Sequence, residues 1–520
     1  MKIKLLFTIA FIIALLNVSN AQITTQKIDS LMNKAMTEFN VVGASVAVIA
    51  DGKIVLEKGY GVKSLTTKEP VNEYTNFQIA SNSKAFTATA LSILVDEGKI
   101  KWDDKVITYI PEFKMYNDYV TQNFIIEDLL CHRSGLGLGA GDLMEFPAGG
   151  DFGIEDVLKN LQYFKPVSPF RTKWDYDNQL YLVAGELIKR VSGMSWEEFI
   201  QTRIFKPLQM KNSYPANSYI KDFSNVATPH IVNQKEKKTI SLYNFNNKIN
   251  GAAGSIFSNV DDMTKWVQLQ LNGGKYGEKS DKILFSKERQ DKMWKIHTVM
   301  DADFDERYKS HFSGYGLGWF LNDQNGNFVV EHTGGLDGML SIVRMIPDKK
   351  FGIIVLTNTQ DGGIYLDYAM ANILTDYILN VPKEDWISKY SSRFKNRLKE
   401  GDSITEKVWK TVADNKNVKI KNEDYIGIYE DNWFGKCEIF MKGNKLWFKS
   451  YRSPQLNGEL QYYNANTFAI SWEYQGFDAD AFAMFTLDEN GKAQSIKMKG
   501  ISPNIDFSFD FQDLDLKRIK

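Results

Sequence analysis

The chain has 520 residues, with 63 Lys and Arg against 64 Asp and Glu, so its formal net charge is −1. This balance excludes a protein that relies on strong electrostatic attraction to nucleic acid, and the 43% of hydrophobic residues excludes a disordered chain. We expect two folded domains, because the length exceeds what one compact core usually accommodates.

The first 21 residues have the pattern of a signal peptide. A short cationic start precedes an apolar run at residues 5–16, and Ser19-Asn20-Ala21 supplies the small residues that a signal peptidase reads. The run is too short for a helix across a bilayer core of about 30 Å. No cysteine follows it, so a lipoprotein anchor is not expected. We expect a periplasmic or secreted protein that begins at Gln22 without a stable membrane anchor; an uncleaved anchor is the alternative.

Strand patterns occur at two distant places in residues 22–385. Residues 41–60 predict a hairpin with its turn at Asp51-Gly52, and a second group of strands is predicted at residues 327–331, 339–346 and 351–357. Helical periodicity dominates between them, at residues 83–96, 126–130, 179–191, 196–204 and 260–271, and an apolar helix is predicted at 365–379. This order predicts an α+β domain with one antiparallel sheet, closed by distant segments and flanked by helices.

The pattern changes after this domain. Residues 386–420 are highly charged and predict a solvated helical linker. Residues 421–520 alternate apolar and polar positions between turns, which predicts a small all-β domain, a barrel or a sandwich. Aromatic residues at strand spacing there either fill the core or line a ligand-binding interior. Cys131 and Cys437, the only two cysteines, are expected to be buried thiols, with one inter-domain disulfide as the alternative.

Ser81 and Lys84 are the first residues that indicate chemistry. They stand three apart where a helix is predicted to begin, so both side chains lie on one helix face. An unassisted serine hydroxyl is a weak nucleophile, and a lysine with a desolvated ammonium can remove its proton. Backbone N–H groups at a helix start can also polarise an acyl oxygen. By itself the pair is more typical of an N-cap serine with a surface lysine.

Two further segments make this spacing more specific. Tyr176 and Asn178 stand in a turn or loop just before a predicted helix, and His332 ends a predicted strand. Thr333, Gly334 and Gly335 follow the histidine directly. Each segment also has an ordinary structural interpretation, as a turn with a packed tyrosine and as a strand end with glycines. The three segments in this order are more specific than any one of them.

With residues 128–136, 252–263 and 315–319, these motifs resemble the serine β-lactamase and penicillin-binding-protein superfamily. The similarity is to its class C β-lactamase-like branch, with D-aminopeptidases, D-Ala-D-Ala carboxypeptidases and carboxylesterases, and it covers residues 27–379. It implies a β-lactamase-like serine hydrolase domain at residues 22–385. The C-terminal domain resembles lipocalin-like modules that follow some members of this family.

The resemblance also implies roles for the motif residues. Ser81 would be the acylated nucleophile, Lys84 its partner base, Tyr176 a proton relay to the leaving group, and Asn178 a holder of the substrate amide and the lysine. Backbone N–H groups of Ser81 and Gly335 would form an oxyanion hole, with Thr333 and Gly334 contacting the substrate. Whether Lys84 or Tyr176 is the base stays open, because their titrations would be coupled.

The third motif departs from the β-lactamase pattern. His332 occupies the position where those enzymes have a lysine, and a histidine supplies less fixed positive charge at pH 7. We therefore expect an exported serine hydrolase that cleaves amide or ester bonds, in small peptides, D-amino-acid peptides or cell-wall fragments. A β-lactamase, a penicillin-binding sensor with slow turnover, and a vestigial scaffold are alternatives. No cofactor, metal or nucleic-acid partner is expected, and the oligomeric state stays open.

Overall fold

A computed structural model describes residues 23–520, except residues 234–235, 243–248, 250 and 303–305. The expected signal peptide at residues 1–21 lies outside the described residues. Among the described helices, none combines the length and the apolar character that a membrane crossing requires.

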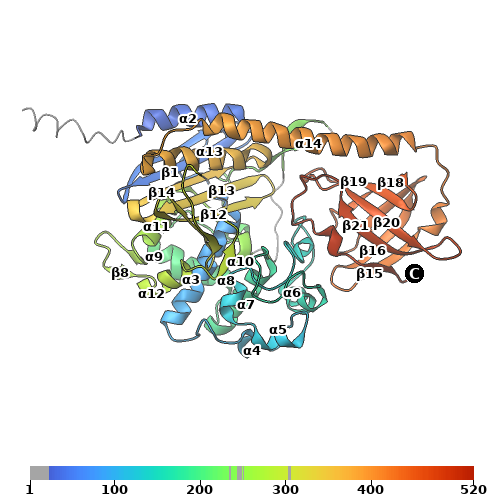
Figure 1. The fold of residues 1–520 in the computed structure, drawn as a ribbon, viewed down its shortest axis with the longest axis horizontal. Coiled ribbons are helices and arrows are strands. Elements are labelled where there is room, and N and C mark those ends of the chain that lie inside the picture. The colour runs from blue at the N-terminus through green and yellow to red at the C-terminus, as the bar shows by residue number, and fades with distance from the viewer. Residues whose placement is uncertain (1–22, 234–235, 243–248, 250, 303–305) are drawn as a thin grey trace, which may run out of the picture.

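The centre of the first domain is an eight-stranded antiparallel sheet (Figure 1). Its strands come from both ends of the domain, as the sequence predicts. In chain order they are β1 (Gly43–Ala50), β2 (Lys53–Gly61), β9 (Thr298–Met300), β10 (Ser313–Tyr315), β11 (Phe320–Gln324), β12 (Asn327–Leu336), β13 (Met339–Ile346) and β14 (Phe351–Thr357). The spatial order is β2-β1-β14-β13-β12-β11-β10-β9, so the first hairpin pairs with the last strand.

Both faces of this sheet are covered. In β1, Val46 and Val48 face the core beneath α2 (Thr25–Glu38), α13 (Gln360–Leu379) and the start of α14 (Trp386–Asp414). Ala47 and Ile49 face the opposite core, which includes α3 (Ser83–Asp96) and α11 (Val260–Leu271). Alternation of side chains along a strand explains this division, and burial on both faces explains why the strand is apolar at nearly every position.

A helical region is inserted between β2 and β9, and it carries Ser81, Lys84, Tyr176 and Asn178. Besides α3 and α11 it contains α4 (Val106–Tyr109), α5 (Asp118–Asn123), α6 (Ile154–Asn160), α7 (Gln179–Ser192), α8 (Trp196–Ile200), α9 (Lys206–Leu208), α10 (Gly251–Gly254) and α12 (Lys287–Met293). Short strand pairs accompany them: β3 (Phe77–Gln78) with β6 (Phe257–Ser258), β4 (His230–Asn233) with β5 (Lys238–Ser241), and β7 (Lys275–Tyr276) with β8 (Lys282–Ile283).

The second domain is a closed eight-stranded barrel. Its strands are β15 (Gly427–Asp431), β16 (Gly435–Lys442), β17 (Lys445–Ser450), β18 (Asn457–Asn464), β19 (Thr467–Trp472), β20 (Ala481–Leu487), β21 (Ala493–Gly500) and β22 (Leu516–Arg518). The aromatic residues Tyr429, Phe448 and Trp472 fill its interior. Of the two architectures left open by the sequence, the barrel is therefore the one formed, and the α+β fold with a barrel-like second domain is confirmed.

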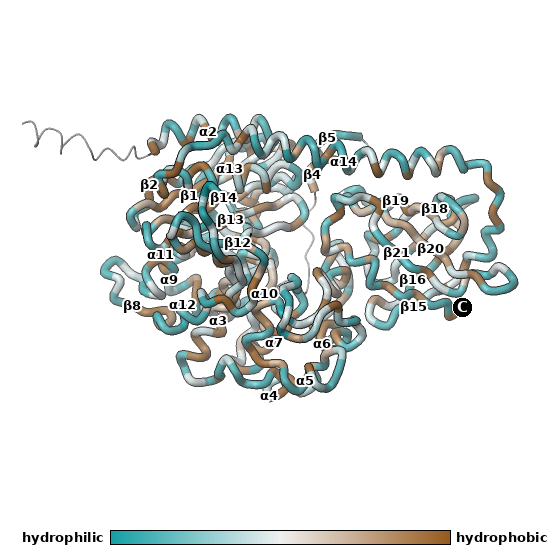
Figure 2. The backbone as a smooth tube through the Cα atoms, viewed as in Figure 1, coloured by the Kyte–Doolittle hydropathy of each residue, from teal (hydrophilic) through white to brown (hydrophobic). Residues whose placement is uncertain are grey.

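The long helix α14 runs from the sheet to the barrel (Figure 1). It is mainly hydrophilic along the stretch between the two domains (Figure 2). Val408 and Val412 are its buried residues on the barrel, where they pack with Ala469 and Ile501.

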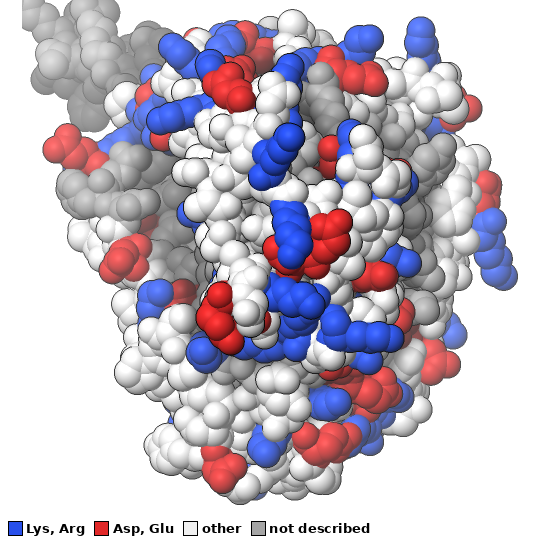
Figure 3. Space-filling model, turned by 90° about the vertical axis from the view of Figure 1, so that its right-hand side faces the viewer, with Lys and Arg blue, Asp and Glu red and all other residues white. Residues whose placement is uncertain are grey.

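The barrel also contacts the helical region directly. Arg452 binds the Asp156 carboxylate with both terminal nitrogens, at 2.8 and 2.7 Å, and the Trp433 ring packs on Phe164. Cys131 and Cys437 are both buried and free, so no disulfide joins the domains. On the face at the barrel end of the molecule, basic and acidic side chains are interspersed (Figure 3).

Candidate active site

Ser81 lies on a short 3₁₀ turn, Ala80–Asn82, directly before α3. Ala80 adopts a left-handed conformation with φ of 49°, which bends the chain sharply before the serine. The turn is fixed to β13, because the Ser341 hydroxyl donates to the Ile79 carbonyl at 2.7 Å and accepts from Asn82 Nδ2 at 2.8 Å. The serine is thereby held on a rigid support, with its side chain partly open to solvent.

Lys84 is fully buried on the first turn of α3 and points at Ser81. Its Nζ lies 3.0 Å from Ser81 Oγ, 2.7 Å from Asn178 Oδ1 and 3.0 Å from the carbonyl oxygen of Ala253. The last two atoms can only accept hydrogen bonds. A neutral amine has two N–H donors, so it satisfies both oxygens and leaves its lone pair for the Ser81 hydroxyl. This geometry fits a proton acceptor.

Burial makes the neutral form of this lysine accessible. Desolvation lowers the pKa of Lys84 from 10.5 to about 7, although the carboxyl groups of Glu145, Asp142 and Asp177 oppose the shift. The rings of Tyr176 and Tyr181 lie 4.8 and 5.1 Å from Nζ and exclude water from it. A lysine in this state carries a usable lone pair near neutral pH.

Tyr176 and Asn178 approach the serine from the segment before α7. The Tyr176 hydroxyl interacts with the Ser81 side chain, and burial raises the pKa of Tyr176 far above 10. The phenol therefore stays protonated at neutral pH and is suited to donate a proton. Asn178 caps the N-terminus of α7, accepts from Lys84 and donates from Nδ2 to Asp142 Oδ2 at 2.8 Å.

Sequence reasoning missed the acidic residues beneath these groups. Asp142 and Glu145 lie in the loop between residues 135 and 152, are buried, and accept from Asn178 and Gln179 at 2.8 Å each. Burial raises the pKa of Glu145 to about 7 and that of Asp142 well above 3.8. Only the fold brings this loop under α7, and its spacing carries no recognisable motif.

His132 supports the tyrosine from behind. Its ring packs on Tyr176 with centroids 4.2 Å apart, and its Nδ1 accepts from the Asp177 N–H at 3.0 Å. Its backbone φ is 55°, so it occupies a tight turn. Among the described residues its Nε2 has no hydrogen-bond partner, so its contact with the motif is the ring packing on Tyr176.

His332 is buried in β12 and held by its neighbours. Nδ1 lies 2.6 Å from the Thr333 carbonyl oxygen, which can only accept, so Nδ1 carries the proton and Nε2 accepts from the Tyr315 hydroxyl at 2.8 Å. Burial and the charge of Lys84 lower the pKa of His332 to about 3. The residue is therefore neutral at pH 7 and adds no fixed positive charge.

The strand that carries Thr333, Gly334 and Gly335 has a free edge. β11 pairs with β12 only up to Glu331, while β13 pairs with β12 up to Leu336. Gly334 lies against the serine turn: a Cβ there would come 2.2 Å from the Ile79 carbonyl oxygen, so only glycine fits. Gly335 is exposed beside this contact. The side of β12 that is not paired with β11 therefore lies beside the turn that carries Ser81.

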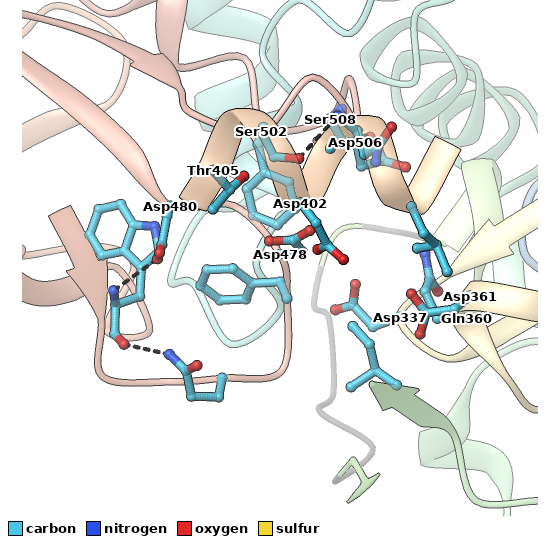
Figure 4. A pocket seen from close by; sticks show the side chains of 18 of the residues that line it. Asp337, Gln360, Asp361, Asp402, Thr405, Asp478, Asp480, Ser502, Asp506 and Ser508 are labelled. Atoms are coloured by element: carbon cyan, nitrogen blue, oxygen red, sulfur yellow. Dashed lines mark hydrogen bonds between the residues drawn. The ribbon is translucent and has the colours of Figure 1, made fainter. Parts of the chain in front are cut away.

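A cavity of about 1030 Å³ begins at this edge and extends between α14 and the barrel. Thr333, Gly334 and Gly335 line its inner end. Among the described residues that line it, nine are acidic and two are basic. Asp337, Asp361, Asp402 and Asp478 approach it from both domains (Figure 4). Carboxyl groups therefore outnumber basic groups in the cavity that begins at this edge.

The structure thus joins Ser81, Lys84 and Asn178 by hydrogen bonds and packs Tyr176 against Lys84. This group lies next to β12, which carries His332, Thr333, Gly334 and Gly335. Within the described part of the chain, no group of His, Cys, Asp and Glu is arranged to hold a metal ion. A serine with a desolvated lysine and a buried tyrosine defines a serine hydrolase. The chain belongs to the Beta-lactamase family, whose model matches residues 28–375.

Relatives of known name agree with this class. The chain is 27% identical over 400 residues to Unguisins hydrolase ungD' of Aspergillus campestris, covering 72% of this chain and 70% of that protein. It is 27% identical over 339 residues to Protein flp of Staphylococcus aureus, covering 64% of this chain and 63% of that protein. Residues 418–518 match a domain of unknown function, DUF3471.

The fold has solved counterparts. The octameric penicillin-binding protein homologue from Pyrococcus abyssi superposes with a TM-score of 0.58 at 23% identity, over 95% of this chain and 100% of that chain. SurE superposes with a TM-score of 0.55 at 17% identity, over 94% of this chain and 98% of that chain. Both similarities concern the fold alone, and they extend through the barrel.

Proposed function

We propose that the protein is an exported serine hydrolase that forms an acyl-enzyme on Ser81 and cleaves amide or ester bonds. The observation that carries this proposal is the position of Lys84 Nζ, 3.0 Å from Ser81 Oγ with two obligate acceptors on its other side. Export rests on the signal-peptide pattern of residues 1–21, which places the enzyme in the periplasm or outside the cell.

In acylation, Ser81 Oγ attacks the acyl carbon and its proton passes to the neutral amine of Lys84. The developing oxyanion accepts from the backbone N–H groups of Ser81 and Gly335. Tyr176 then gives its hydroxyl proton to the leaving group and regains one from the Lys84 ammonium. The strongly raised pKa of Tyr176 supports this donor role, and the lowered pKa of Lys84 supports its role as base.

In deacylation, water attacks the ester carbon of the acyl-enzyme. Its proton passes to Lys84, the bond between Ser81 Oγ and the acyl carbon breaks, and Ser81 regains a proton from the lysine. Asn178 keeps Lys84 oriented through both steps, because Asp142 fixes the amide so that its oxygen faces Nζ. No cofactor or metal enters either step.

We further propose small peptides, D-amino-acid peptides or cell-wall fragments as substrates. Neutral His332 and the excess of carboxylates in the cavity disfavour anionic groups such as the carboxylate of a penicillin. Neutral or cationic peptides and esters meet no such repulsion. The name of the relative Unguisins hydrolase ungD' supports a hydrolase, and the closed eight-stranded barrel supports a lipocalin-like module.

Intact-protein mass spectrometry over time tests the proposal. Wild type and Ser81→Ala are each incubated with a fluorophosphonate and, separately, with a penicillin. We expect a fluorophosphonate adduct only on the wild type, with little or short-lived penicillin adduct. Labelling that persists in a folded Ser81→Ala variant would overturn Ser81 as the nucleophile. A long-lived penicillin adduct would instead support a penicillin-binding sensor, and no adduct from either probe would indicate a vestigial site.

A further inference from the structure

The segment after β21 returns from the barrel to the active site. It carries the Phe507 ring to Tyr176, with centroids 5.8 Å apart and planes at 76°. This is an edge-on contact between a barrel residue and the tyrosine that packs on Lys84. The barrel thus contributes a side chain to the surroundings of the reacting groups.

This position of Phe507 is built into both domains. Asp510 is fully buried and accepts from the N–H groups of Gly141 and Leu143, at 2.9 Å each. At Gly139, whose φ is 72°, a Cβ would come 2.7 Å from the Phe507 carbonyl oxygen and 2.9 Å from its ring. Two hydrogen bonds and one close backbone approach therefore fix the segment after β21 against the hydrolase domain.

Phe507 is nevertheless not a core residue. Its relative exposure is 39%, although one side of the ring packs on Tyr176 and Gly139. Its neighbours Asp506 and Ser508 line the acidic cavity. The open part of the ring is therefore an apolar surface between two residues that line the cavity, and the packed part lies against the Tyr176 ring. An exposed aromatic surface at a binding cleft is typical of a ligand contact.

We propose that Phe507 determines specificity for the leaving group. In the proposed mechanism Tyr176 protonates the leaving group, so the leaving group lies beside Tyr176. The Phe507 ring packs on Tyr176 and can therefore contact the substituent of the leaving group. Phe507 then favours substrates with an apolar or aromatic group on the leaving side of the scissile bond. This inference rests on the proposed function of Ser81 and Tyr176, and it gives the barrel a role in substrate choice.

Paired esters with the same acyl group test this role. The benzyl and methyl esters of N-acetyl-D-alanine release alcohols of similar acidity, so their ratio of kcat/KM reports contacts of the leaving group. We expect the full-length wild type to prefer the benzyl ester. Phe507→Ala should reduce this preference about three- to tenfold, the usual effect of one aromatic contact, and Phe507→Leu should reduce it less. The rate of fluorophosphonate labelling at Ser81 should change less than twofold.

Tyr451→Ala is the matched control, because Tyr451 is 45% exposed on the barrel, donates to Glu438 and has Lys449 over its ring, whereas the Phe507 ring packs on Tyr176. Its ester ratio should equal that of the wild type. An unchanged ratio in Phe507→Ala, an equal loss for both esters, or a wild type that labels but cleaves neither ester would overturn the inference. Absence of labelling at Ser81 in the wild type would overturn the proposed function instead.

Discussion

The pH dependence of acylation tests the role of Lys84 most directly. With its pKa lowered from 10.5 to about 7, about half of the molecules carry a neutral amine at pH 7, against roughly one in 3000 for an ordinary lysine. The same shift means that the ammonium form of Lys84 is less stable, relative to the neutral amine, by about 5 kcal/mol than in an ordinary lysine. Since only the neutral amine accepts a proton, kcat/KM should rise about tenfold per pH unit below 7 and level off above about pH 8.

The assay is the hydrolysis of a neutral ester between pH 5 and 9.5, so that the substrate itself does not titrate. Tyr176→Phe should lower the plateau by about 100-fold or more without moving the midpoint, because the proposed mechanism uses Tyr176 as the acid. If the Tyr176 phenolate were the base, the rising limb would lie above pH 10, since burial raises the pKa of the phenol. A rate that is constant between pH 5.5 and 8.5 would refute Lys84 as the base.

Other groups near Lys84 must be separated from it in this profile. The titratable residues around its ammonium are Asp142, Glu145, Asp177, Tyr176, Tyr181, His132 and His332. Glu145 and Asp177 also titrate near pH 7. The negative charge of Glu145 raises the pKa of Lys84, so Glu145→Gln should move the rising limb to lower pH. If kcat/KM of Glu145→Gln no longer rose with pH, the rise in the wild type would be due to titration of Glu145 and not of Lys84.

Two further predictions concern stability. Asp510→Ala should lower the free energy of unfolding by about 2–6 kcal/mol, because two buried N–H groups lose their acceptor. Urea unfolding measures this change, and an unchanged free energy of unfolding would contradict the role of Asp510 in holding the two domains together. Asp367 on α13 is buried, and neither carboxyl oxygen has a hydrogen-bond partner among the described residues. Burial raises its pKa well above 3.8, so the folded state keeps this proton to higher pH than the unfolded chain does, and stability is lost as pH rises above about 4. Asp367→Asn should therefore stabilise the protein more at pH 8 than at pH 5, by about 1.4 kcal/mol for each pH unit between 5 and the pKa of the folded carboxyl. An equal effect at both pH values in urea unfolding would show that the carboxyl is not held neutral.

Local patterns predicted the elements that carry the motif. The helix predicted at residues 83–96 is α3 over the same residues, and the strands predicted at 339–346 and 351–357 are β13 and β14. These segments have strong periodicity, and their burial on defined faces follows from it. Ser81 and Lys84 therefore meet as their spacing predicts, although the serine stands on a separate 3₁₀ turn before the helix.

Other features depend on contacts that no local pattern records. The sequence predicts a strand at residues 327–331, but the observed strand β12 continues through Gly334 and Gly335. It does so because β13 supplies pairing partners such as Ser341. Pairing with a neighbouring strand outweighs the weak strand preference of glycine. The helix α2 and the buried carboxyl of Asp142 were also missed, since each owes its place to segments distant in the chain.

The same distant contacts link the barrel to the chemistry. Asp510 of the barrel holds the backbone on both sides of Asp142, Asp142 orients Asn178, and Asn178 accepts from Lys84. The position of Lys84 is therefore linked to a carboxyl from the other domain. A shift of the barrel loop would leave the buried N–H groups of Gly141 and Leu143 without their acceptor and free the backbone around Asp142 to move. The two domains together, rather than the hydrolase domain alone, form the unit that orients the reacting groups.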